Sequence, residues 1–318
     1  MRMKKSYVNA QTSSFEWSVA EVQLGATALI WSSGMPALPL PIATLAAASH
    51  IAPSLVAPFF RRMMLNPRRH VRPPPVLSLP PADQRIDLGD GLVAWRWGQG
   101  PVVLLVHGFE GNRAQFAAIV AALIERGFAA VALDVPAHGE SAGDELTAVT
   151  FIAAIERTLA RLAPVHAVIG HSLGAAMSLY SVAHTGGANR VALISAPSSL
   201  TRELNRFASA VGLSDRGRKA FIASVEANVG RPAADFDVRR IAGKVGLPML
   251  LVHDQNDRQV PVIESARTAH VLPSAELMVT RGLGHNRLLA DPVVVRAVVD
   301  FVDQETPTQE TMANACTM

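Results

Sequence analysis

The chain has 318 residues, of which 49% are apolar, enough for one large α/β domain and an additional segment. Its formal net charge is only +3, and no basic stripe is interleaved with aromatic residues, so the sequence argues against nucleic-acid binding. The single cysteine, Cys316, lies in the polar C-terminal tail, which excludes an intrachain disulfide and argues against a cysteine nucleophile.

Residues 1–81 are predicted to form an N-terminal extension. Residues 22–60 contain no Asp, Glu, Lys or Arg. Prolines divide this run, and its longest proline-free pieces, residues 22–35 and 42–52, are shorter than the roughly 20 apolar residues that a membrane-spanning helix needs. Apolar helical pieces beside the arginines of positions 61–72 fit a peripheral membrane contact through residues 22–72. The alternative is an apolar arm that packs on the domain or on a second subunit.

Two proline clusters, at positions 73–75 and 80–81, predict a stiff linker between this extension and the rest of the chain. Residues 304–318 are predicted to be a disordered tail. We expect a cytoplasmic protein, with membrane association through the extension left open. The sequence leaves the oligomeric state open.

From about residue 85 short β-like runs alternate with helical patterns. Residues 85–88 and 92–97 indicate a hairpin across the Gly-Asp-Gly turn at 89–91. Further strands are predicted at residues 102–106, 129–133, 165–169, 191–195, 249–253 and 276–279. Helices are predicted at residues 114–126, 147–162, 175–183, 263–271 and 292–302. This alternation predicts an α/β fold, with a mostly parallel central sheet covered by helices on both faces.

The stretch from 199 to 246 is too long for a simple crossover between two strands. It contains helical patterns at residues 200–211 and 218–228, which predict a small helical cap inserted over a site. The main domain is then expected to span residues 82–303, with the cap inside it.

The most informative motif is Gly170-His171-Ser172-Leu173-Gly174, which follows a predicted strand and opens a predicted helix. Its two glycines remove the Cβ atoms that would collide where a strand reverses tightly into a helix. This context predicts a serine on a strained corner, with its hydroxyl exposed at a helix N-terminus.

A serine hydroxyl is a weak nucleophile that needs a base and hydrogen-bond donors for the oxyanion. His285 is the predicted base, because it lies in a glycine-flanked loop between the last strand and the last helix. Asp254 and Asp257 both follow the strand at 249–253. We favour Asp257 as the acid, since a carboxylate at the very end of a strand, like that of Asp254, often bonds turn amides instead.

The oxyanion donors are predicted to be the backbone amides of Phe109 and Leu173. Leu173 follows the serine, and Phe109 lies in the loop after the strand at 102–106. His107 in the same loop is expected to hold the loop by hydrogen bonds. His171 is expected to point away from the serine and to pack or support the site.

These motifs, in the order Ser172, Asp257, His285, together with the His-Gly-Phe loop, resemble the α/β-hydrolase superfamily over residues 85–303. The Asp-Val-Pro-Ala-His-Gly-Glu-Ser segment at 134–141 is similar to a family loop, with Ala137 in place of its first glycine. Within the superfamily, the chain is most similar to bacterial esterases and serine aminopeptidase-like hydrolases with a short cap. The resemblance implies a serine hydrolase that cleaves a small-molecule carboxylic ester or thioester through an acyl-enzyme.

Three alternatives use the same nucleophile: an acyltransferase, a peptidase and a cofactor-free perhydrolase. A different alternative is a membrane-associated binding protein that keeps the fold without catalysis. No cofactor is expected, because no Gly-x-Gly-x-x-Gly follows the first parallel strand, and no metal is expected, because the histidines and the single cysteine lack metal-ligand spacing.

Overall fold

The computed structural model describes residues 40–68 and 78–304. The predicted helical piece at 22–35, the prolines at 73–75, Cys316 and the tail from residue 305 lie outside the described residues. Among the described residues, no helix is both long and apolar enough to cross a membrane.

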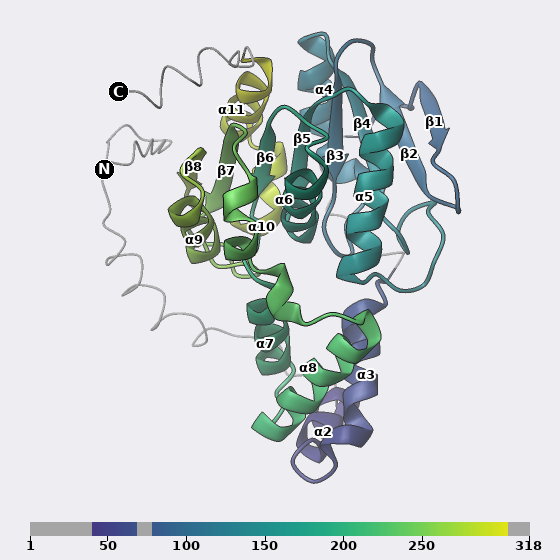
Figure 1. The fold of residues 1–318 in the computed structure, drawn as a ribbon, viewed down its shortest axis with the longest axis vertical. Coiled ribbons are helices and arrows are strands. Elements are labelled where there is room, and N and C mark those ends of the chain that lie inside the picture. Colours follow the sequence, from purple (N-terminus) through teal and green to yellow (C-terminus); the bar gives the residue numbers. More distant parts are fainter. Residues whose placement is uncertain (1–39, 69–77, 305–318) are drawn as a thin grey trace.

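One eight-stranded sheet organises the fold, in the order β1-β2-β4-β3-β5-β6-β7-β8 (Figure 1). The strands are β1 (Gln84–Asp87), β2 (Val93–Trp97), β3 (Val102–Val106), β4 (Ala129–Asp134), β5 (Val165–His171), β6 (Val191–Ile194), β7 (Met249–Asp254) and β8 (Ala275–Thr280). Strands β1 and β2 form the predicted hairpin, β2 pairs antiparallel with β4, and all other pairs are parallel. The predicted α/β class with a mostly parallel sheet is therefore confirmed.

Helices cover both faces of this sheet. One face packs against α4 (Ala117–Glu125) and α11 (Pro292–Asp303). The other packs against α5 (Ala148–Leu162), α6 (Leu173–Thr185) and α9 (Ile263–Val271). Successive residues of β3 point to opposite faces and all four from 103 to 106 are fully buried, which explains why its sequence is continuously apolar.

The sequence patterns predicted the presence of each helix more accurately than the residues at which it begins and ends. The pattern at 114–126 is a 3₁₀ turn, Arg113–Phe116, followed by α4. The pattern at 218–228 begins earlier, as α8 (Asp215–Val229), because the Ser214 side chain accepts a hydrogen bond from the backbone N–H of Gly217 and caps the helix.

A separate lobe lies beyond the sheet and combines segments that are distant in sequence (Figure 1). It contains α7 (Leu200–Ala210) and α8 from the predicted cap, and α2 (Leu40–Ala48) and α3 (Pro53–Leu65) from the N-terminal extension. Phe60 of α3 and Phe221 of α8 are fully buried in their shared apolar core. Residues 40–65 of the extension therefore pack on helices of the predicted cap.

Polar contacts fix the tip of this lobe. The Ser49 hydroxyl accepts a hydrogen bond from the backbone N–H of Ser214, and the Ser214 hydroxyl donates to the Ser49 carbonyl. A Cβ at Gly217 would lie 2.5 Å from the Ser49 Cβ, so the first turn of α8 packs closely on the turn between α2 and α3. We call these four helices the cap lobe.

Candidate active site

Ser172 occupies a tight turn between β5 and α6. Its backbone has φ 54° and ψ −127°, a conformation that L-residues adopt at a cost of order 1–3 kcal/mol. A Cβ at Gly170 would collide with the backbone of Ala175, and one at Gly174 would collide with the carbonyl oxygen of His107. Both glycines of the motif are therefore required by close backbone packing, as the sequence predicted.

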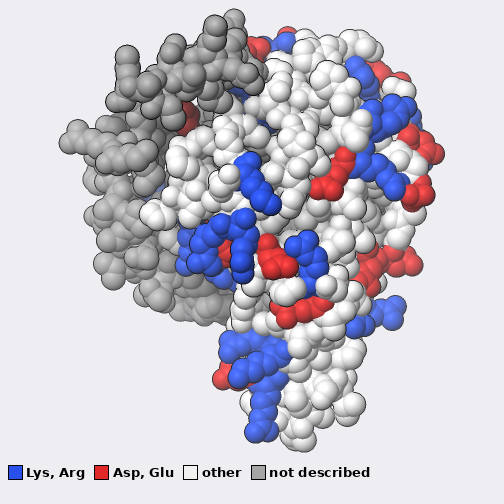
Figure 2. Space-filling view, in the orientation of Figure 1, with Lys and Arg blue, Asp and Glu red and all other residues white. Residues whose placement is uncertain are grey.

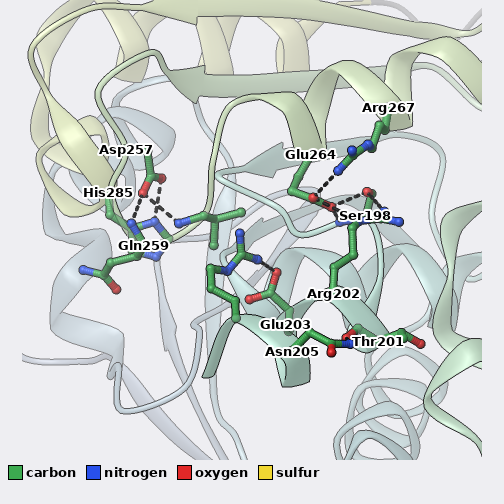
Figure 3. A network of polar contacts seen from close by, with 12 residues as sticks. Ser198, Thr201, Arg202, Glu203, Asn205, Asp257, Gln259, Glu264, Arg267 and His285 are labelled. Atoms are coloured by element: carbon green, nitrogen blue, oxygen red, sulfur yellow. Dashed lines mark hydrogen bonds and ion pairs between the residues drawn. The ribbon is translucent and has the colours of Figure 1, made fainter. Parts of the chain in front are cut away.

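Asp257 and His285 are joined by a hydrogen bond of 2.7 Å between Asp257 Oδ2 and His285 Nδ1 (Figure 3). The other carboxylate oxygen accepts from the backbone N–H groups of Gln259 and Val260, at 2.8 and 2.9 Å. Burial alone would raise the pKa of Asp257, but hydrogen bonds from His253 and His285 hold this pKa well below its ordinary value. Asp257 is therefore a charged, fixed acceptor for the His285 ring.

Asp254 has a different set of partners. Its carboxylate accepts from the Thr280 hydroxyl at 2.8 Å and from the backbone N–H groups of Leu283 and Asn256, at 3.0 and 2.8 Å. These contacts hold the start of the loop that carries His285. Of the two candidate aspartates, Asp257 contacts the imidazole and Asp254 contacts turn amides.

His285 lies beside the serine turn because it packs on the neighbour of Ser172. The rings of His171 and His285 are 4.7 Å apart, and His171 Nε2 donates to the His285 carbonyl at 3.0 Å. Burial, with a smaller contribution from His285, lowers the pKa of His171 to about 3, so this ring stays neutral. Among the described residues, the Ser172 hydroxyl hydrogen-bonds to no side chain, His285 included.

The loop after β3 lies against the serine. A Cβ at Gly108 would be 2.8 Å from the Ser172 Cβ and 3.3 Å from its hydroxyl oxygen, so only glycine leaves this space open. Within residues 40–68 and 78–304, the backbone N–H groups of Phe109 and Leu173 donate to no acceptor in the protein. Both predicted oxyanion donors are therefore unpaired in the described structure.

Two histidines brace this loop. His107 Nδ1 donates to the Gly108 carbonyl at 2.8 Å, and its Nε2 accepts from the backbone N–H of Val135 at 3.3 Å. His138 Nε2 accepts from the backbone N–H of Glu110 at 2.9 Å. Burial, followed by the nearby His138, lowers the pKa of His107 to about 3. Since both of its ring nitrogens are occupied, His107 holds the loop, the role that the sequence indicated.

The segment at 134–141 keeps its loop shape without the first glycine. Ala137 has φ 64° and its backbone N–H donates to the Ala142 carbonyl at 2.9 Å, so alanine adopts the left-handed conformation here. Asp134 accepts from Trp95 Nε1 at 3.0 Å and Arg113 Nη1 at 2.7 Å. A Cβ at Gly139 would collide with the Asp134 carboxylate, so the one glycine of the segment is required.

Sequence reasoning missed two supports of the site. His253 Nε2 lies 3.4 Å from Asp257 Oδ2, a contact that the position of His253 at the end of a predicted strand does not indicate. Arg68 forms a two-pronged ion pair with Glu110, at 2.7 and 2.8 Å, and so connects the N-terminal extension to the loop of Phe109. No spacing signal links Arg68 to Glu110, because the two lie 42 residues apart.

Residues 40–68 and 78–304 contain no candidate metal site. No group of three or more His, Cys, Asp or Glu side chains there could hold a metal ion.

Comparisons with known proteins identify the family to which this fold belongs. A family model described as "alpha/beta hydrolase fold" matches residues 101–231, and one described as "TAP-like protein" matches residues 228–313. The 2-(acetamidomethylene)succinate hydrolase of Mesorhizobium japonicum is 25% identical over 267 residues, which cover 69% of this chain and 95% of that protein. A solved esterase of Pyrococcus furiosus is 22% identical, with a TM-score of 0.56 over 75% of this chain and 96% of that one.

The thioesterase domain from the curacin biosynthetic pathway shares the same fold. It is 16% identical, with a TM-score of 0.53 over 70% of this chain and 98% of that domain. The chain therefore belongs to the α/β-hydrolase superfamily of hydrolase enzymes, which confirms the resemblance seen in the sequence.

Proposed function

We propose that this chain is a serine hydrolase that cleaves a carboxylic ester or thioester through an acyl-enzyme intermediate. The observation that carries the proposal is the 2.7 Å hydrogen bond between His285 and Asp257 at the loop that packs beside the Ser172 turn. The esterase and thioesterase neighbours share this fold.

The proposed reaction begins when Ser172 Oγ attacks the substrate carbonyl carbon. His285 Nε2 takes the hydroxyl proton, while the Nδ1–H group of the same ring stays hydrogen-bonded to the Asp257 carboxylate. The oxyanion of the tetrahedral intermediate accepts hydrogen bonds from the amides of Phe109 and Leu173. His285 then gives its proton to the leaving alcohol or thiol, and the acyl group stays on Ser172.

Deacylation reverses these roles with water as the nucleophile. His285 takes a proton from water, the hydroxyl attacks the acyl carbon, and the proton returns to Ser172 as the acid leaves. The lowered pKa of Asp257 keeps its carboxylate charged, so that it stabilises the imidazolium formed in both half-reactions. The N-terminus of α6 lies beneath Ser172 and adds a favourable dipole for the oxyanion.

The acyl acceptor and the bond type are the open variables of this proposal. The relative from Mesorhizobium japonicum is named for an acetamido compound, so amide substrates belong in the assay beside esters and thioesters. Cleavage of a peptide bond would identify a peptidase, whereas transfer of the acyl group to an alcohol or to peroxide would identify an acyltransferase or a perhydrolase, since all use the same acyl-enzyme.

The test is Ser172→Ala, assayed on p-nitrophenyl esters and acyl thioesters of increasing chain length. We expect a loss of about 10⁴-fold in kcat with the fold retained, because a triad member is removed. Ser195→Ala is the matched control, since Ser195 also has a positive φ but is fully buried at the end of β6, outside the serine turn.

Fluorophosphonate labelling separates an enzyme from a binding protein that keeps the fold. We expect labelling of the wild-type protein and of Ser195→Ala at Ser172, and none of Ser172→Ala. Unchanged ester hydrolysis by Ser172→Ala, or labelling at another residue, would contradict the assignment of the nucleophile.

A further inference from the structure

The outer face of α3 carries an apolar ridge that the packing of the cap lobe does not use. The residues of this α3 ridge are Ile51, in the turn before the helix, and Leu55, Phe59 and Met63 on the helix, which are 91%, 82%, 43% and 38% exposed. They are four of the seven large apolar residues exposed in the described part of the chain. The other three are scattered over separate helices, so the exposure is concentrated at one place.

The spacing of the ridge explains its shape. Leu55, Phe59 and Met63 recur every four residues and so follow one side of the helix. Val56 and Phe60 are buried in the lobe core, where α3 packs against α8. The ridge residues are not part of the lobe core, and their exposure costs free energy unless a second surface covers them.

Positive charge accompanies the ridge. Arg62 is exposed on the same side of α3, and Arg61, which reaches the Ser224 hydroxyl, lines an open hollow of about 450 Å³ next to Phe59. Glu145 also lines this hollow. Between residues 22 and 72 the sequence has five arginines and no acidic residue. In Figure 2 the side of the projecting lobe on which Figure 1 draws α3 is mostly uncharged, and most of the visible Lys and Arg of the lobe lie on the side of α7.

We propose that the α3 ridge docks peripherally on a bilayer that contains anionic phospholipid. The four apolar side chains would enter the headgroup and upper acyl region, while the guanidinium groups of Arg61 and Arg62 bind lipid phosphates. This arrangement uses both features of the face, its apolar ridge and its flanking cations, and it needs no spanning helix.

A second copy of the chain fits the same face less well. A two-fold contact through α3 would place the same surface on both sides. The arginines of one arm would then face those of the other, and residues 40–68 supply no carboxylate to pair with them. Anionic phosphates on a lipid surface are the complementary partner.

The test uses the full-length chain and sedimentation with vesicles of phosphatidylcholine alone or mixed equally with phosphatidylglycerol. We expect binding to the mixed vesicles that weakens as salt is raised, and little binding to phosphatidylcholine. Ile51→Ser/Leu55→Ser and, separately, Arg61→Gln/Arg62→Gln should each weaken binding to the mixed vesicles by about tenfold or more. Both variants keep residues 1–39 intact, so a loss is assigned to the ridge.

Val293→Ser is the matched control, because Val293 is 46% exposed on α11, outside the cap lobe. It should bind vesicles as the wild-type chain does, and all variants should keep the wild-type thermal unfolding midpoint and ester hydrolysis in solution. Failure of the wild-type chain to bind mixed vesicles overturns the proposal, as does equal binding by the ridge variants. A wild-type dimer that Ile51→Ser/Leu55→Ser dissociates, without vesicle binding, assigns the face to self-association instead.

Discussion

The carboxyl edge of the sheet and the cap lobe are built on different physical principles. At the sheet edge, directional hydrogen bonds fix the two aspartates: Asp257 accepts from two backbone amides and a histidine, and Asp254 accepts from two amides and a hydroxyl. The cap lobe is held mainly by a small apolar core of residues from two distant segments. Changes at the edge should therefore alter chemistry, and changes in the lobe should alter stability.

A second polar network marks the boundary between these regions. Glu264 at the start of α9 accepts from Ser198, Arg202 and Arg267 (Figure 3). Burial alone would raise its pKa, but the hydrogen bonds from Ser198 and the charge of the arginines hold that pKa below its ordinary value. Since Ser198 precedes α7, this network anchors the first residues of the cap to the helix that follows the Asp257 loop.

The largest expected effect is that of Asp257→Asn on catalysis. The amide can no longer fix the tautomer of His285 that accepts the serine proton, so kcat should fall by about 10⁴-fold with the fold intact. Steady-state ester hydrolysis and thermal unfolding measure the two quantities. Asp254→Asn is the matched control. It should lower the unfolding temperature, and it should lower kcat far less than Asp257→Asn does.

The same variant has a signature in the pH dependence of stability. The pKa of Asp257 is lowered in the folded protein, so its contribution to stability is present above the unfolded carboxyl pKa and is lost as the pH falls through the folded value. Wild-type and Asp257→Asn unfolding free energies should therefore converge on acidification. A difference that grows towards acid pH would contradict the hydrogen-bonded, charged carboxylate.

The next largest expected effect is a difference in stability between a buried and an exposed position of α3. Phe60→Ala removes a fully buried ring from the lobe core and should cost about 3–5 kcal/mol of lobe stability. Phe59→Ala, at the adjacent and 43% exposed position, should cost far less. Denaturant unfolding followed by circular dichroism measures both. Equal costs at the two positions would mean that the lobe core does not depend on α3 as the packing indicates.

The sheet edge could be predicted from sequence because its motifs are local. A glycine-flanked serine between a strand and a helix, and a histidine in a glycine-flanked loop, each need only a few neighbouring residues to be recognised. The parallel order of the strands then brings Asp257 and His285 to one edge. The choice between Asp254 and Asp257 followed from the distance of each from its strand end.

The cap lobe could not be predicted in the same way. The apolar run of the extension fits a lipid surface and a protein core equally well, because both bury apolar side chains and periodicity does not identify the partner. The packing of Phe60 on α8 links positions about 160 residues apart. The contact of Arg68 with Glu110 could not be predicted for the same reason, because only the tertiary fold brings these two residues together.

The smallest expected effect concerns Arg68, whose ion pair with Glu110 joins the extension to the loop of Phe109. Arg68 is 77% exposed, so its ion pair with Glu110 should contribute no more than about 1 kcal/mol to stability. The hydrogen bond from Arg68 lowers the pKa of Glu110, so this contribution should be lost as the pH falls through that lowered value. Arg68→Ala should lower kcat/KM by about two- to fivefold, because Glu110 adjoins the predicted oxyanion donor.

A double-mutant cycle tests whether the Arg68–Glu110 ion pair contributes to kcat/KM. If the pair acts as a unit, Glu110→Gln and Arg68→Ala should each lower kcat/KM, and combining them should add little. Arg126→Ala is the control, since Arg126 pairs with Asp300 and Asp303 at the surface of α11. Additive losses at Arg68 and Glu110, or an equal loss at Arg126, would show that the extension stabilises the protein without positioning the loop. A non-additive loss would make the N-terminal extension part of the structure that holds the Phe109 amide in place.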